Sequence, residues 1–171
     1  MGCSEDIFPP GNAGKLAELA DPLVKGADGR TVYDTGRYRF VKGDAPASVN
    51  PSLWREQALN AQAGFFKVAE GIYQIRGYDL ANMTLVETRN GWIVIDTLFT
   101  EDMARAGLKL AMQTLKSSKP VVAVIYTHSH ADHFGGIRGV VDEADVRSGK
   151  VKLIAPDGFM VNAIAENVLA G

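Results

Sequence analysis

The residues with the clearest chemistry lie in one short segment, positions 127–136, which reads THSHADHFGG. It contains all 3 histidines of the chain together with one aspartate: His128, His130, Asp132 and His133. Imidazole nitrogen and carboxylate oxygen are common zinc ligands, and carboxylates also suit manganese or iron. The clustering predicts a metal site, with donors for two ions. A set of surface or capping histidines is the alternative.

The spacing explains how these side chains can meet. Alternate residues of an extended segment face the same way, so His128, His130 and Asp132 can converge on one point. The next residue, His133, requires the backbone to turn. We expect the glycine pair 135–136 to supply a flexible, uncrowded backbone just after that turn.

Composition limits the possible functions. The chain has 171 residues, 46% hydrophobic and 22% charged, with a formal net charge of −2, as expected for one soluble globular domain or part of one. It has no lysine or arginine cluster for a nucleic-acid partner. Its longest apolar run, 121–126, is far shorter than the ~20 residues of a membrane span. The start, MGCSEDIFPP, lacks the features of a signal peptide. The compartment is unknown; the cytoplasm is favoured, with the periplasm or secretion as alternatives if the start is truncated.

Residues 1–64 contain many glycines, prolines and Asp/Asn turn residues and little periodicity. They predict an irregular N-terminal arm that packs on a larger body. Short helices are expected at 13–20 and at 53–62, the second capped by Ser52, with a strand or two within 31–41.

Residues 65–171 have a regular α/β pattern. Strands at 83–88 and 92–96 form a hairpin in which Asn90-Gly91 is expected to adopt positive backbone angles. Thr100 caps a helix to about Lys116, and an apolar run at 121–127 predicts a strand buried on both faces. We expect the metal segment where this strand ends, followed by a helix at 137–143, a strand at 151–155 and a helix at 159–169.

The segment THSHADHFGG, with a buried strand before it and an earlier strand ending in Asp96, resembles the metallo-β-lactamase superfamily. Longer stretches resemble the linear alkylsulfatases within it, dinuclear-zinc enzymes that release sulfate from alkyl sulfate esters. They are KGDAPASVNPSLWREQALN, GIYQIRGYDLANMTLVET, GWIVIDTL, KPVVAVIYTHSHADHFGGIRGVVDEADV and IAPDGFM. The fold implied for 65–171 is the N-terminal half of an αββα sandwich. Thr97 departs from the family, whose members tend to have proline there.

The resemblance implies a role for each residue of the loop. His128 and His130 would bind a first zinc ion, and Asp132 and His133 a second. In the alternative mononuclear site, Asp132 would act chiefly as a catalytic base. Asp96 is the candidate for orienting the loop or a ligand N–H, and a plain turn or capping aspartate is its alternative.

The resemblance also implies that the family members contain further parts that this chain does not have. Its members are several times longer, take further metal ligands from later segments and form homodimers through regions absent here. We therefore expect an N-terminal fragment, a truncated gene product or one piece of a split protein, without the distal metal ligands of the family. The alternatives are another hydrolase of the superfamily (a thioesterase, lactonase or β-lactamase) and a catalytically silent fragment.

Overall fold

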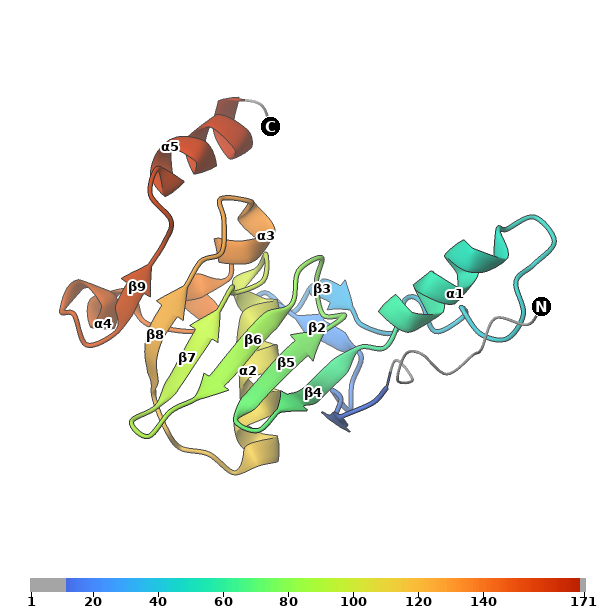
Figure 1. Ribbon diagram of the computed structural model, residues 1–171, viewed down its shortest axis with the longest axis horizontal. Coiled ribbons are helices and arrows are strands. Elements are labelled where there is room, and N and C mark those ends of the chain that lie inside the picture. Colours follow the sequence, from blue (N-terminus) through green and yellow to red (C-terminus); the bar gives the residue numbers. More distant parts are fainter. Residues whose placement is uncertain (1–11, 170–171) are drawn as a thin grey trace.

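A computed structural model of the chain describes residues 12–169, and its centre is a seven-stranded mixed sheet with the strand order β1-β4-β5-β6-β7-β8-β9 (Figure 1). Neighbouring strands are antiparallel from β1 to β7, and β7, β8 and β9 are parallel. The strands are β1 (Lys15–Ala17), β4 (Gly64–Ala69), β5 (Ile72–Arg76), β6 (Met83–Glu87), β7 (Trp92–Ile95), β8 (Val121–Ile125) and β9 (Lys152–Ile154).

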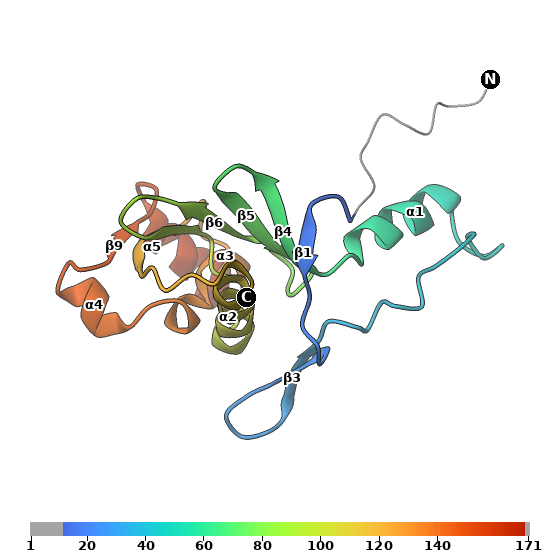
Figure 2. The same cartoon turned by 90° about the horizontal axis from the view of Figure 1, so that it is seen from below.

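Helix α2 (Glu101–Leu115) lies on one face of this sheet (Figure 2). The Thr100 side chain caps it by accepting from the Met103 N–H, and the left-handed Lys116 ends it, as the sequence predicts. Its buried face includes Gly107, where a Cβ atom would lie 3.1 Å from Ile75 Cγ2. The helix therefore packs close to the centre of the sheet.

The two faces of the sheet differ. The face toward α2 holds the core, with Ile75, Met83, Leu85 and Val94 fully buried. On the opposite face Arg76 lies over the Phe66 ring and donates to Gln74. One sheet with a helix layer on one face confirms the predicted fold class, the N-terminal half of an αββα sandwich.

The N-terminal residues are less irregular than the sequence predicts. The helix expected at 13–20 is wrong, because β1 forms there and pairs with β4, so that tertiary pairing overrides local propensity. The helix expected at 53–62 is confirmed as α1 (Pro51–Asn60), but Asn50 rather than Ser52 caps it by accepting from the Ser52 N–H. Strands β2 (Leu23–Lys25) and β3 (Thr31–Asp34) form a separate pair. The domain division at residue 64 stays a prediction.

The hairpin of β6 and β7 is confirmed, but its turn is not the expected one. Neither Asn90 nor Gly91 has a positive φ. The glycine is needed instead for close approach, because a Cβ atom at Gly91 would lie 2.4 Å from the carbonyl oxygen of Pro120. Thr88 closes the turn by donating its hydroxyl to the Gly91 carbonyl at 2.7 Å.

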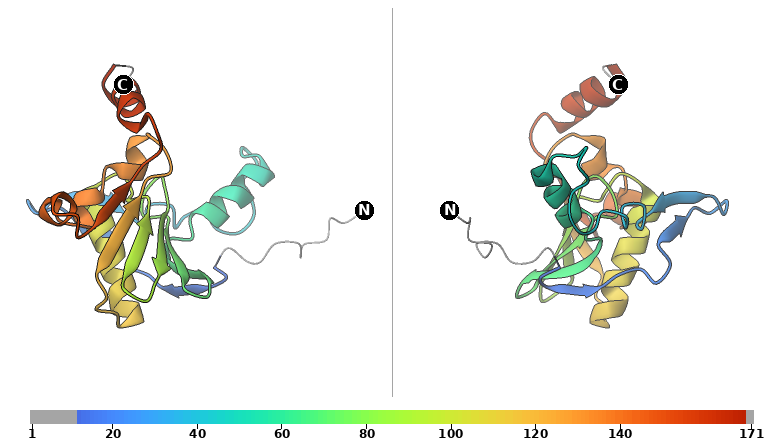
Figure 3. Two further views of the ribbon diagram at one scale, coloured as in Figure 1. Left: turned by 60° about the vertical axis from the view of Figure 1, so that its left-hand side comes forward. Right: turned by 90° about the vertical axis from the view of Figure 1, so that its right-hand side faces the viewer.

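The chain after β8 also differs in detail. The strand expected at 121–127 is β8 (Val121–Ile125), and only Ala123 and Val124 within it are buried. The helix expected at 137–143 is replaced by two short pieces. Helix α5 begins as predicted and stands away from the sheet (Figure 3), continuing as a π-helical turn. The elements are α3 (Ala131–Phe134), η1 (Ile137–Gly139), α4 (Glu143–Arg147), α5 (Phe159–Ile164) and the π-helical η2 (Ala165–Leu169).

No helix within residues 12–169 has the length and apolar character needed to cross a membrane. The expectation about a signal peptide at the start of the chain lies outside the described residues.

Tyr78 attaches the N-terminal segment to the body of the protein. Its buried hydroxyl accepts from the Leu19 N–H at 2.9 Å, just beyond β1. Burial raises the pKa of Tyr78 to about 12. Because the ionised form is disfavoured in the folded state, this group's contribution to stability is fully present below pH 10, the pKa of an unperturbed tyrosine. It is lost as the pH rises through about 12.

We expect Tyr78→Phe to lower the free energy of unfolding by about 1 kcal/mol at neutral pH, because the Leu19 N–H loses its partner. The loss relative to the wild type should shrink between pH 10 and 12, since phenylalanine cannot ionise. Urea denaturation at pH 7, 10 and 11.5 measures both effects. An unchanged difference at all three values would contradict the assignment of this titration to Tyr78.

Candidate metal centre

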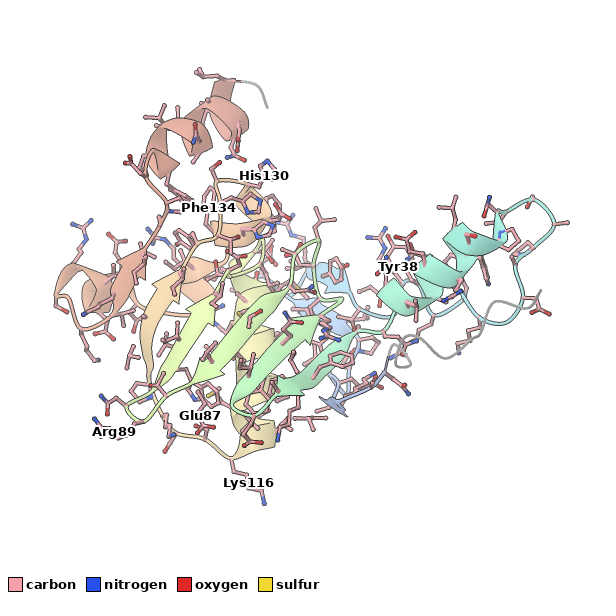
Figure 4. All side chains as sticks on the ribbon, viewed as in Figure 1. Tyr38, Glu87, Arg89, Lys116, His130 and Phe134 are labelled. Atoms are coloured by element: carbon pink, nitrogen blue, oxygen red, sulfur yellow. The ribbon has the colours of Figure 1, made fainter. Side chains whose placement is uncertain are left out.

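The candidate metal centre lies at one edge of the sheet, where the parallel strands β7 and β8 end side by side. Asp96 follows β7, and the loop of residues 127–133 begins just after β8. Figure 4 shows His130 and Phe134 together at this edge. The sequence predicted this position for the site.

Asp96 is a buried carboxylate that accepts hydrogen bonds from the loop. Its Oδ1 lies 2.8 Å from the Thr127 amide nitrogen, and its Oδ2 lies 2.7 Å from the Thr127 hydroxyl and 2.7 Å from His133 Nδ1. A carboxylate only accepts, so Nδ1 of His133 carries a proton and Nε2 is left free for an ion. Asp96 therefore occupies the place expected for an orienting residue.

Thr127 acts in the same way on the first histidine. Its hydroxyl hydrogen points to Asp96, so the oxygen is left to accept from His128 Nδ1, 3.0 Å away. Nε2 of His128 then also has a free lone pair. Asp96 thus fixes the tautomer of His133 directly and that of His128 through Thr127.

The four candidate ligands form two pairs. His128 Nε2 lies 3.0 Å from His130 Nδ1, and His133 Nε2 lies 3.5 Å from Asp132 Oδ2. Two donor atoms held by one tetrahedral zinc at 2.0–2.1 Å lie about 3.3 Å apart. Both separations are close to this distance, so each pair fits two of the ligands of one ion.

Neither pair is a complete ligand set. Within residues 12–169, no group of three or more His, Cys, Asp or Glu side chains is arranged to hold a single metal ion. The donor chemistry and the pairwise distances fit a metal, while the remaining coordination positions need donors from elsewhere.

The two glycines after His133 have a different role from the expected one. The φ angles of Gly135 and Gly136, −60° and −83°, are open to any residue. A Cβ atom would lie 2.3 Å from the Phe99 carbonyl oxygen at position 135 and 2.0 Å from the Thr97 carbonyl oxygen at position 136. These residues are glycines because the loop packs directly on the backbone after β7.

Thr97 adds a contact of its own to this packing. Its N–H donates to the His133 carbonyl at 2.8 Å. A proline at this position, the residue expected from the resemblance to the alkylsulfatases, could not make that bond. Thr97 therefore holds the loop of residues 127–133 to the backbone just after β7.

Sequence reasoning missed three residues that hold the loop in place, two within it (Thr127 and Ser129) and one outside it (Glu166). Thr127 lies inside the motif, and its place at a strand end is the signal that could have found it. Ser129 is buried and bonds to Glu166, 37 residues away, and local sequence carries no signal for such a contact.

An apolar cavity of about 950 Å³ lies beside the loop. Tyr126, Phe134 and Phe159 form its aromatic wall, with ring centroids 5.2–5.9 Å apart. Burial raises the pKa of the Tyr126 hydroxyl. The cavity thus places a large apolar surface next to the candidate ligands.

Residues 76–163 match the metallo-beta-lactamase superfamily, and the chain belongs to it. Within the superfamily the similarity is to alkylsulfatases. The chain is 51% identical to a linear primary-alkylsulfatase of Pseudomonas sp. over 96% of its own length and 24% of that protein. It is 54% identical to an (R)-specific secondary-alkylsulfatase of Pseudomonas sp. over 86% of its length and 22% of that protein.

A solved structure has the same fold. The inverting sec-alkylsulfatase Pisa1 from Pseudomonas sp. superposes with a TM-score of 0.87 at 51% identity, covering 95% of this chain and 25% of that chain. The resemblance to the linear alkylsulfatases is therefore confirmed. The chain spans about a quarter of the length of the curated relatives that it matches.

Proposed function

We propose that this chain carries the metal-binding loop of a zinc-dependent hydrolase of alkyl sulfate esters, which releases sulfate and an alcohol. The observation that carries the proposal is the geometry of the two donor pairs, each with one histidine tautomer set by Asp96 or Thr127. The similarity of about 50% to alkylsulfatases supports this choice of substrate over the thioesters, lactones and β-lactams of other superfamily members.

Each residue of the loop has a defined task in this proposal. His128 and His130 hold one ion, and Asp132 and His133 hold the other. Zinc lowers the pKa of a bound water to about 7 and stabilises negative charge on a leaving oxygen. Asp96 keeps Nε2 of His133 unprotonated, and the aromatic cavity accepts the alkyl part of the ester. In the mononuclear alternative, Asp132 is free of metal and accepts a proton from the attacking water.

A second candidate function rests on the absence of a three-ligand group within residues 12–169. In that case the chain binds one ion weakly and is catalytically silent unless other donors complete the site. A homodimer of the longer protein and a cytoplasmic location remain predictions from the sequence.

Zinc stoichiometry tests the metal-binding part of the proposal. We expect the purified chain, loaded with zinc and desalted, to retain up to two ions, and a chelator to remove them with loss of thermal stability. His128→Ala should retain one ion fewer. Elemental analysis and thermal unfolding with and without chelator measure both. A chain that takes up no zinc while folded would contradict the proposal.

Activity is best tested in a hybrid protein. Replacing the matching segment of the 51% identical primary-alkylsulfatase with this chain should give a protein that releases sulfate from dodecyl sulfate and is inhibited by chelator. The same hybrid with His130→Ala is the matched control and should lose at least about 100-fold in rate. A folded, zinc-loaded hybrid without sulfate release would favour the silent alternative.

A further inference from the structure

The C-terminal end of α5 and η2 returns to the metal loop. Ser129 lies between two candidate ligands, and its hydroxyl donates to Glu166 Oε2 at 2.8 Å. Asn167 Nδ2 donates to the Ser129 carbonyl at 3.2 Å. Two consecutive residues thus contact the hydroxyl and the carbonyl of a single loop residue, which is buried although its neighbours are not.

The contact coincides with a change of helix type. Residues of α5 follow the α-helical pattern to Ile164, and the turn at Ala165–Leu169 is π-helical. Asn167 Nδ2 also donates to the Ala163 carbonyl at 2.8 Å, which ties the turn to the preceding helix. π-helical turns are rare and frequently occur at functional sites.

Glu166 also faces His130. Its Oε2 lies 3.8 Å from Nε2 of this histidine, whose Nδ1 points to His128. A nearby carboxylate favours the tautomer with the proton on Nε2, which leaves the Nδ1 lone pair for an ion. Glu166 is therefore a carboxylate that faces a ring N–H of His130, as Asp96 faces one of His133. The distance is longer, 3.8 Å against 2.7 Å, and the site is more exposed.

We propose that Glu166 and Asn167 are positioning residues that hold Ser129 and thereby fix His130 for metal binding. The inference rests on the proposed function for the metal. The two residues act through the loop and are not themselves ligands of the ion.

Zinc affinity tests the inference through a double-mutant cycle. We expect Ser129→Ala and Glu166→Ala each to weaken zinc binding about 10-fold, as loss of an outer partner of a ligand does. The double variant should be no weaker than Glu166→Ala alone, because both remove the same contact. Glu166→Gln, which can still accept from Ser129, should lose only about threefold. Competition with a chromophoric chelator measures these constants.

The π-helical turn offers a matched control. Asn167→Ala should weaken zinc binding several-fold, whereas Asn162→Ala, in α5 itself and exposed, should not. Losses that multiply to about 100-fold in the double variant would overturn the inference. So would a Glu166→Gln variant as weak as Glu166→Ala, because the charge of Glu166 near His130, and not its hydrogen bond to Ser129, would then carry the effect.

A second readout needs no metal. We expect Glu166→Ala to raise amide hydrogen exchange of residues 127–133 at least fivefold in the metal-free protein, and Asn162→Ala to leave it unchanged. If the wild type takes up no zinc, the proposed function fails, and the exchange rates alone decide the inference. If the wild type binds zinc and neither affinity nor exchange changes in Glu166→Ala, the inference alone fails.

Discussion

Asp96→Asn is expected to weaken zinc binding by about 100-fold, the largest effect of any single substitution outside the ligands. The amide oxygen of asparagine can still accept from the Thr127 N–H. Its NH₂ group would face His133 Nδ1, where the carboxylate Oδ2 now lies at 2.7 Å. His133 must then accept at Nδ1 and carry its proton on Nε2, the atom that the ion requires.

The substitution isolates this effect from backbone strain. Asp96 has a φ of 58°, and asparagine tolerates the left-handed region as well as aspartate does. Asp79→Asn is the matched control, because Asp79 accepts from the Phe99 N–H in the same region and no contact with a histidine involves it. We expect the control to bind zinc within twofold of the wild type by chelator competition. Wild-type affinity in Asp96→Asn would exclude tautomer control by this carboxylate.

The candidate metal loop and the candidate orienting residue Asp96 could be proposed from the sequence because both depend on local rules. Rare donor types cluster within six positions, and parallel strands place their carboxyl ends at one edge of the sheet. Helix α2 was also predictable from local sequence, because its N-cap and its buried face are formed by residues close together in the chain.

The features that the sequence did not reveal depend on long-range contacts. Residues 15–17 pair with β4 at a distance of about fifty positions, and no local signal distinguishes that strand from a short helix. The contacts of Ser129 with η2 were missed for the same reason, because the partners lie almost forty positions away in the sequence. The glycines at 91, 135 and 136 could be read only as sources of flexibility, whereas the carbonyl oxygens that exclude a side chain come from distant segments.

These contacts give the loop its support on three sides. The segment just after β7 contributes Asp96 and the Thr97 N–H, β8 leads into Thr127, and η2 contributes Glu166. A ligand set built on fixed backbone loses little conformational entropy when an ion binds, which is the physical advantage of preorganisation. Disturbing the backbone contact after β7 should therefore affect stability and metal binding together.

Gly136→Ala is expected to cost about 3 kcal/mol of the free energy of unfolding, a large share of the 5–15 kcal/mol typical of a domain. The added methyl group would lie 2.0 Å from the Thr97 carbonyl oxygen, 2.8 Å from the Thr100 carbonyl oxygen and 2.9 Å from Ala104 Cβ. None of these atoms belongs to a flexible side chain, so the loop itself must move away from β7. That movement stretches the Gly136 N–H bond to the Leu98 carbonyl, now 2.9 Å, and the bond between Thr97 and His133.

Gly149→Ala provides the comparison. A Cβ atom there meets nothing within 4 Å, but φ is 76°, so the expected loss is about 1 kcal/mol from backbone strain alone. Urea denaturation of both variants measures the difference, and chelator competition should show weaker zinc binding only for Gly136→Ala. Equal losses in the two variants would mean that the loop can move off β7 at little cost, and the close packing would then not be what fixes His133.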